Sequence, residues 1–226
     1  MKKCQEILIK MLPNVKMCGK LINKLGVDAI NVYDFDNTLY NGESTLDFYF
    51  FCCRRHILLF RFVFIVVFTL IKYKMCLVSE QKLMELCGVY VRKFLDGCSD
   101  IEELAESFWK KNKKKLKSFY KELHRDDDVI VSASFGFLLG HVMKELGVKR
   151  LVCSEVDLDK KEVTRLCYRN NKRQLFEELF PDCEIQDFYT DSFNDRPLME
   201  MAVGNVYLVK GEGKTLINIE KQVDKA

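Results

Sequence analysis

Two pairs of acidic residues each follow an apolar, strand-like run in this chain of 226 residues. Asp34 and Asp36 form one pair, and Asp191 and Asp195 form the other. Carboxylates that meet at one edge of a sheet repel one another unless a cation lies among them. Hard oxygen ligands without a soft partner suit Mg²⁺. The acidic residues therefore predict a magnesium site.

A hydroxyl group and a positive charge complete the candidate phosphate site. Ser132 follows the apolar run 129–131, and Lys172 lies in an Asn-Lys run. Such groups stabilise the equatorial oxygens of a transferring phosphoryl group. An aspartate can act as the nucleophile and form an aspartyl-phosphate, while a second aspartate protonates the leaving group and later activates water.

A plainer interpretation is open for each of these residues taken alone. An Asp-x-Asp pattern after a strand is commonly a turn or a helix cap, and a single serine there is commonly a cap. A single lysine usually lies on the surface. It is the order of all the groups along the chain that favours chemistry.

Alternating strands and helices would bring these residues to one edge of a sheet. The pattern predicts an α/β fold with an open parallel sheet, in which functional groups gather at the carboxyl ends of the strands. Strands are expected at 29–33, 129–131, 150–156, 185–190 and 205–209, a hairpin at 156–163, and helices at 137–146, 170–180 and 197–202.

The helical patterning divides the chain into parts. Residues 1–27 are predicted to form a helical lead, and residues 46–125 are patterned as helices almost throughout. Residues 28–45 and 126–226 carry the α/β pattern. The sequence thus predicts a core that is interrupted by a helical insert just after the first aspartate pair.

The run from Ile57 to Ile71 is apolar on all sides except at Arg61. As a helix it would span roughly 22 Å, which is short of the bilayer hydrocarbon thickness of about 30 Å. We therefore expect it to be buried within the protein, buried in an oligomer interface, or sunk into a membrane surface. In the last case, anionic headgroups would be attracted by the basic residues within 54–74 and by the lysine cluster at 110–117. The plainer interpretation of these lysines is a solvated surface helix.

Charge and cysteine use argue against several classes of protein. The 36 basic and 33 acidic residues leave a net charge of +3, too small to imply a polyanionic partner, and no nucleic-acid-binding signature accompanies the lysines. The 10 cysteines include no CxxC pair, and the three histidines lack zinc-type spacing. The first residues lack the apolar core and cleavage site of a signal peptide. We expect a cytoplasmic protein, membrane-associated if the apolar run contacts lipid, with no nucleic-acid partner.

The aspartate motif and its companions resemble the haloacid dehalogenase superfamily. Residues 34–39, DFDNTL, look like its DxDxT signature. Ser132 and Lys172 follow in the expected order, and residues 191–195 resemble the closing DxxxD motif. The resemblance implies a Rossmann-like core, with a parallel sheet flanked by helices, and an α-helical cap inserted over 46–125, as in the phosphoserine-phosphatase-like branch.

The resemblance also implies an activity. It points to a Mg²⁺-dependent phosphatase that acts through an aspartyl-phosphate on a small phosphorylated metabolite or a phospholipid headgroup phosphate. By motif position it implies Asp34 as the nucleophile and Asp36 as the general acid and base. Four residues would contact the phosphate: Ser132, Lys172, Thr38 and Asn194. The dehalogenating branch lacks the second aspartate, so Asp36 favours phosphate chemistry.

The same resemblance implies a ligand set for Mg²⁺. Asp191 would bind the metal beside Asp34 and the main-chain carbonyl of Asp36. Asp195 would support the metal or orient the phosphate-binding lysine. Thr38 would hold the motif loop.

Some residues depart from the pattern of the branch. Ala133-Ser134 stands where Gly-Gly is common, and Arg173-Gln174 follows the motif lysine where a glycine is common. These departures and the apolar run argue against phosphoserine itself as the substrate. Four polar residues just past the first motif are candidates to contact the leaving group, with a simple helix N-terminus as the alternative: Glu43, Ser44, Thr45 and Asp47. A non-catalytic phospholigand-binding relative and a phosphotransferase stay open, and the sequence does not indicate the oligomeric state.

Overall fold

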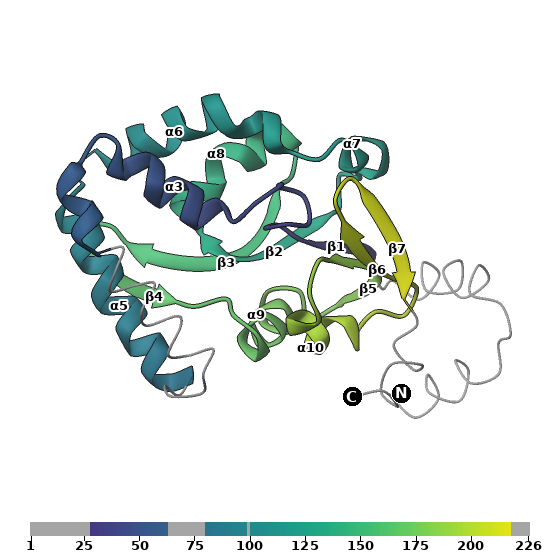
Figure 1. Cartoon of the computed structure of the whole chain (residues 1–226). Coiled ribbons are helices and arrows are strands. Elements are labelled where there is room, and N and C mark those ends of the chain that lie inside the picture. Colours follow the sequence, from purple (N-terminus) through teal and green to yellow (C-terminus); the bar gives the residue numbers. More distant parts are fainter. Residues whose placement is uncertain (1–27, 63–79, 99, 218–226) are drawn as a thin grey trace, which may run out of the picture.

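A mixed sheet lies at the centre of the computed structural model, which describes residues 28–62, 80–98 and 100–217 (Figure 1). The sheet has seven strands in the order β4-β3-β2-β1-β5-β6-β7. The strands are β1 (Asp28–Asp34), β2 (Val129–Phe135), β3 (Arg150–Asp157), β4 (Glu162–Arg165), β5 (Cys183–Thr190), β6 (Val206–Lys210) and β7 (Gly213–Ile217).

The inner strands are parallel and the two edge strands are not. β1 pairs in parallel with β2 and with β5, and the parallel pairing continues to β3 on one side and to β6 on the other. β4 and β7 pair antiparallel with β3 and β6. The predicted α/β fold with a parallel sheet is confirmed, and the sequence analysis did not predict β7.

Helices connect most of the strands of the sheet, and they lie between β1 and β2 or between later strands. The α-helices are α3 (Ser44–Cys53), α5 (Glu80–Asp96), α6 (Ile101–Asn112), α7 (Phe119–Leu123), α8 (Gly136–Leu146), α9 (Asn170–Leu179) and α10 (Arg196–Met199). The 3-10 helices are η1 (Ile57–Leu59), η2 (Lys113–Lys115) and η3 (Phe193–Asp195).

Both faces of β1 are covered, which explains why residues on both faces of the strand, such as Ile30 and Tyr33, are apolar and buried. Ile30 and Val32 point to one face and are buried in a cluster with Phe176 of α9. Tyr33 points to the other face and is buried in a cluster with Trp109 of α6. Figure 1 shows α3, α6 and α8 on one side of the sheet and α9 and α10 on the other. This sandwich fixes the end of β1 at the centre of the molecule.

The stretch predicted as a helical insert contributes directly to the layer over the sheet. The indole nitrogen of Trp109 in α6 donates a hydrogen bond to the Leu138 carbonyl of α8 at 2.7 Å. The segment after η2 reaches the first aspartate motif, where Lys117 N donates to the Leu39 carbonyl at 2.8 Å. Residues from the far end of the insert therefore support the motif loop.

Two of the sequence predictions fall partly or wholly outside the described residues. The helical lead at 1–27 lies outside them, and so does the part of the apolar run after Phe62. Among the helices that the structure describes, none is long and apolar enough to span a bilayer.

Candidate active site

The site begins at the carboxyl end of β1, where the chain leaves the centre of the sheet. Asp34 is the last residue of this strand, and its side chain is buried. Thr38, from the loop that follows, donates its hydroxyl hydrogen to Asp34 Oδ2 at 3.1 Å. The loop closes on itself because the Leu39 and Tyr40 amides both donate to the Phe35 carbonyl. The motif threonine thus anchors one oxygen of the aspartate.

A buried lysine contacts the other oxygen of Asp34. Lys172 Nζ, from the first turn of α9, lies 2.7 Å from Asp34 Oδ1 and 2.8 Å from Asp195 Oδ1. Asp195 is held in turn, because Thr190 Oγ1 donates to its second oxygen at 2.9 Å. Residues far apart in the sequence therefore form one buried carboxylate–ammonium–carboxylate group.

Burial and charge act in opposite directions on this group. Burial raises the pKa of Asp34 to about 8, and the ammonium of Lys172 opposes that rise without cancelling it. Burial lowers the pKa of Lys172, but the carboxylates of Asp34 and Asp195 outweigh it, and its pKa is raised overall. Lys172 therefore stays protonated and favours the ionised form of Asp34, the form that a nucleophile requires.

Asp36 lies in a separate network of hydroxyl groups. Its Oδ1 accepts a hydrogen bond from Ser44 N at 2.6 Å, and its Oδ2 accepts one from Ser134 Oγ at 2.7 Å. Ser134 Oγ also lies 2.9 Å from Ser44 Oγ and 2.8 Å from Thr45 Oγ1. Because a serine has one hydroxyl hydrogen and Ser134 gives it to Asp36, the other two hydroxyls donate to Ser134.

Burial and this network act in opposite directions on the pKa of Asp36. Burial raises the pKa of Asp36, and the hydrogen bonds from Ser44 and Ser134 lower it. A carboxyl whose pKa is raised holds its proton to a higher pH, as a general acid must. Ser134 stands where the sequence departs from the expected glycine, and no sequence signal indicated that its side chain contacts Asp36.

The remaining predicted residues differ in how they are placed. Ser132 is fully buried in β2, and its Oγ accepts the Ser134 amide at 3.1 Å. Asp191 is half-buried, and burial followed by the charge of Asp195 raises its pKa. Asn194 has an exposed side chain in η3, and its amide donates to Ser192 Oγ.

Lys117 is a residue of the site that the sequence analysis did not identify. It was grouped with the surface lysines at 110–117, but it is 4% exposed and donates a hydrogen bond to the Asn37 carbonyl in the motif loop. Burial lowers its pKa, and Glu212 and Asp191 oppose that shift. Asn37 has a φ of 58°, so the loop carries a left-handed residue at the point where Lys117 holds it.

The acidic residues fit a magnesium ion with few protein ligands. Within the described residues, no three His, Cys, Asp or Glu side chains are grouped as a metal site. Mg²⁺ keeps several water ligands and often uses only one or two carboxylates. Asp34 and Asp191 supply that number. Burial raises the pKa of both, so a cation beside them would offset the free-energy cost of burying their negative charges.

Comparison with known proteins agrees with this geometry. A family model described as haloacid dehalogenase-like hydrolase matches residues 32–200. No curated protein matches the sequence.

Several solved structures have the same fold at low sequence identity. A protein of unknown function from Bordetella pertussis Tohama I is 18% identical, with a TM-score of 0.59 over 77% of this chain and 86% of that chain. A HAD family hydrolase from Salmonella enterica serovar Typhi is 12% identical, with a TM-score of 0.50 over 85% of this chain and 70% of that chain. A phosphoserine phosphohydrolase-like protein from Francisella tularensis is 16% identical, with a TM-score of 0.50 over 79% of this chain and 85% of that chain.

The family match spans every motif from Asp34 to Asp195, and the fold brings the buried charged residues of those motifs to the end of β1. The chain belongs to the haloacid dehalogenase-like hydrolases.

Proposed function

We propose that this protein is a Mg²⁺-dependent phosphomonoester hydrolase that works through an aspartyl-phosphate on Asp34. The observation that carries the proposal is the buried Lys172 ammonium, which lies between Asp34 and Asp195 at 2.7 and 2.8 Å. The lysine favours the ionised form of Asp34 against the effect of burial, and it offers a positive charge to an entering phosphate. Asp36, with its raised pKa, supplies a proton beside it.

The first chemical step forms the covalent intermediate. A carboxylate oxygen of Asp34 attacks phosphorus, the bond from phosphorus to the alcohol oxygen breaks, and Asp36 gives its proton to that oxygen. Ser132 and Lys172 bind the phosphoryl oxygens, and Asn194 would have to turn inward to join them. The alcohol then leaves as a neutral molecule.

The second step returns the enzyme to its starting state. Asp36, now ionised, takes a proton from a water molecule that attacks phosphorus. The bond from phosphorus to Asp34 breaks, and inorganic phosphate leaves. Ser134 and Ser44 hold Asp36 through both steps by their hydrogen bonds to its two oxygens.

Asp34, Asp191 and the main-chain carbonyl of Asp36 would hold the magnesium ion, with Asp195 supporting the group through Lys172. When bound, the ion neutralises phosphate charge and stabilises the charge that develops during transfer. The half-buried position of Asp191 leaves it accessible to an ion from solvent.

The substrate class in this proposal is a small phosphorylated metabolite or a phospholipid headgroup phosphate. The helical insert at 46–125 acts as a cap that contacts the leaving group. In the same proposal the protein is cytoplasmic and binds no nucleic acid. A phosphotransferase would use the same residues but pass the phosphoryl group to an alcohol. A non-catalytic relative would bind phosphate without turnover.

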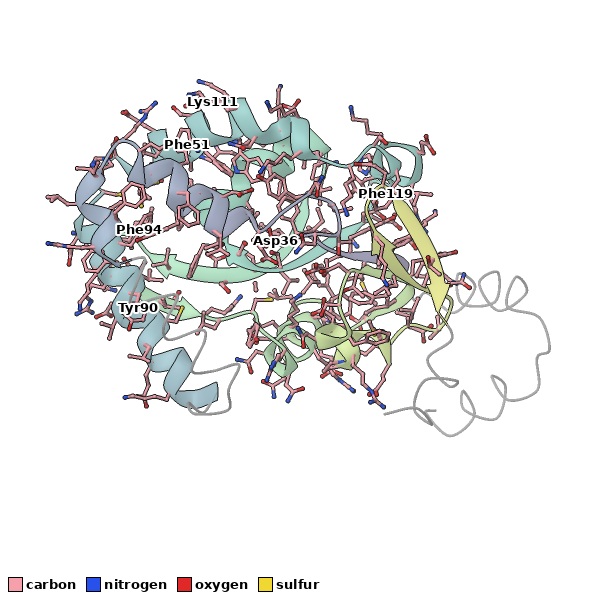
Figure 2. The ribbon with its side chains drawn as sticks, in the orientation of Figure 1. Asp36, Phe51, Tyr90, Phe94, Lys111 and Phe119 are labelled. Atoms are coloured by element: carbon pink, nitrogen blue, oxygen red, sulfur yellow. The ribbon has the colours of Figure 1, made fainter. Side chains whose placement is uncertain are left out.

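A peripheral membrane contact is a second part of the proposal. Ile57 and Leu58 are 74% and 72% exposed, and they follow the exposed Arg54 and Arg55. The Lys111 ammonium and the Arg55 guanidinium both lie 5.6 Å from the ring of Phe51, so basic groups from the two predicted regions share one face, where Figure 2 labels Phe51 and Lys111.

Other lysines of the 110–117 cluster are less suited to lipid headgroups. Lys110, Lys113 and Lys115 form ion pairs at 2.8, 3.1 and 2.8 Å with acidic side chains of the protein. Co-sedimentation with anionic vesicles at low salt tests the contact. The proposal expects binding by the wild type and loss of binding by the double variant Ile57→Glu, Leu58→Glu; equal binding would contradict it.

Phosphate release tests the catalytic proposal. The substrates are phosphoamino acids, sugar phosphates, nucleotides, alkyl phosphates and a phospholipid phosphate in detergent, assayed with Mg²⁺ or EDTA. The expected result is release that requires both Mg²⁺ and Asp34, with the folded Asp34→Asn variant inactive. Transfer to an added alcohol would indicate a phosphotransferase, and binding without turnover would indicate a non-catalytic relative.

A further inference from the structure

An apolar cavity opens directly from the Asp36 end of the candidate site. Its volume is about 400 Å³, within the range of small-molecule pockets. Asp36 and Ser134 line one end of it, and the wall beyond them comes from α3, α5 and the start of α8. Figure 2 shows Asp36 at the centre of the molecule and Phe94 and Tyr90 of α5 to one side of it.

Aromatic side chains form the wall away from Asp36. The ring of Phe48 packs edge-on against Phe94, with centroids 6.2 Å apart, and lies 6.0 Å from the ring of Phe137. The ring of Tyr49 lies 5.6 Å from that of Phe94. Rings that pack against one another have few alternative positions, so the described wall is preformed.

The hydroxyl groups of Tyr49 and Ser154 on this wall are engaged within the protein. Tyr49 donates its hydroxyl to the Leu59 carbonyl at 2.6 Å, and Ser154 donates to the Ala133 carbonyl at 2.7 Å. The lining residues that the structure describes include no Lys, Arg or His, whereas Glu43 adds a carboxylate near Asp36. A leaving group that carries a carboxylate would find no partner there and would face two acidic residues.

We propose that this cavity receives the alcohol part of the substrate and that this part is apolar, an alkyl or aromatic group. The inference rests on the proposed phosphomonoester hydrolysis and narrows its substrate class to phosphomonoesters with a hydrophobic leaving group. The phosphate lies at Asp34 and Lys172, the ester oxygen at Asp36, and the hydrophobic group extends past Ser134 toward Phe48 and Phe94.

A series of alkyl phosphates from methyl to octyl tests the inference, since their alcohols have similar acidity and differ mainly in apolar surface. The expected result is a rise in kcat/KM of about three- to fourfold for each added methylene until the cavity is full. Phosphoserine, which is polar and carries a carboxylate, should be hydrolysed less efficiently than butyl phosphate. Equal kcat/KM along the series, or a preference for phosphoserine, would overturn the inference.

Matched variants connect the effect to the cavity. Val91 lines the cavity from α5, whereas Val89 on the same helix is 47% exposed and does not. Val91→Asp should flatten the chain-length dependence while methyl phosphate is still hydrolysed, and Val89→Asp should leave both unchanged. If Val91→Asp does not fold, Leu46→Asn serves the same purpose, because Leu46 lines the cavity and is 42% exposed. A chain-length dependence that survives in the folded cavity variant would overturn the inference.

A binding measurement separates failure of this inference from failure of the proposed function. Absence of turnover on every phosphomonoester would overturn the proposed hydrolysis. Calorimetric binding of methyl, butyl and octyl phosphonate in the presence of Mg²⁺ would then decide the inference, which requires tighter binding with chain length.

A further comparison identifies the source of the apolar group. Hydrolysis of monomeric octyl phosphate but not of a long-chain lipid phosphate in vesicles would indicate soluble substrates. The reverse order of efficiency would indicate a lipid. Either order supports an apolar leaving group.

Discussion

At the scale of single residues, Lys172 allows two carboxylates to be buried together at the end of β1. Its ammonium contacts both Asp34 and Asp195. Removing one partner of a buried ion pair commonly costs about 3–5 kcal/mol, because a charge is left without compensation. Variants of Lys172 would therefore lose stability together with activity, and Asp36 offers a cleaner test of the chemistry.

Asp36→Asn should lower kcat for an alkyl phosphate by about 10²- to 10⁴-fold, because the variant cannot protonate the leaving alcohol or activate water. Asparagine retains an oxygen that can accept the Ser44 amide, which donates to Asp36 Oδ1 at 2.6 Å. Rapid-quench kinetics should show that the first release of nitrophenol from 4-nitrophenyl phosphate is much less affected, since that leaving group needs no proton. Equal losses for both substrates in this first step would contradict the role of Asp36 as the acid.

Lys117→Met should loosen the motif loop, because the buried Lys117 ammonium donates to the Asn37 carbonyl. A hydrogen bond to a charged group is commonly worth about 1.5–3 kcal/mol, so we expect a loss of that size in the free energy of unfolding, with a reduced kcat. Urea denaturation measures the loss.

The exposed Lys114 provides the control for Lys117. Lys114→Met should change the free energy of unfolding by less than about 0.5 kcal/mol and leave kcat unchanged. If the two variants behave alike, Lys117 has no part in holding the motif loop.

At the scale of elements, the connection from β5 to β6 depends on a close approach of two backbone segments. Gly204 N donates to the Gln186 carbonyl at 2.8 Å. A Cβ at Gly204 would overlap that same carbonyl oxygen, which cannot move away cheaply. Gly140 lies within α8, and a Cβ there would meet no atom within 4 Å.

Gly204→Ala should therefore lower the free energy of unfolding by about 1–3 kcal/mol. Gly140→Ala should raise it by about 0.5–1 kcal/mol, since alanine restricts the unfolded chain and fits a helix interior. Thermal and urea denaturation measure both. A Gly204→Ala protein as stable as the wild type would show that the β5–β6 connection tolerates a side chain.

The strand elements also show where prediction from sequence succeeds. β1, β2 and β5 lie inside the sheet and bury apolar residues such as Ile30, Val131 and Phe188, and all three strands were predicted. β7 (Gly213–Ile217) was not predicted, because its sequence GKTLI is short and only partly apolar, as is typical of an edge strand with few buried residues.

At the scale of the whole molecule, the sequence predicted the residues that follow strands of the sheet more readily than those that reach the site from elsewhere. Asp34 ends β1 and Asp195 lies in the turn after β5, so the order of the motifs along the chain was sufficient to single them out. Lys117 reaches the motif loop from the end of the helical insert, and its inward position depends on how α6 packs against α8. In the sequence it is one lysine among several, and nothing local distinguishes it.

Magnesium should stabilise the whole protein, because an ion that binds only the folded chain adds its binding free energy to stability. At a concentration about 100-fold above the dissociation constant, the melting temperature should rise by roughly 5–10 °C, and EDTA should reverse the rise. Asp191→Asn should fold, since Asp191 is half-buried, but should lose most of the shift. An undiminished shift in this variant would exclude Asp191 as a ligand.

The most direct test of the central claim is to trap the covalent intermediate. The wild-type protein is mixed with a phosphomonoester that it turns over and Mg²⁺, quenched in acid within one turnover, and digested for mass spectrometry. The claim predicts one added phosphoryl group on the peptide that contains Asp34, absent with EDTA and absent in Asp34→Asn. Two results would contradict the claim. One is turnover of the substrate by the wild type with no phosphoryl group on that peptide, and the other is full activity of the Asp34→Asn variant.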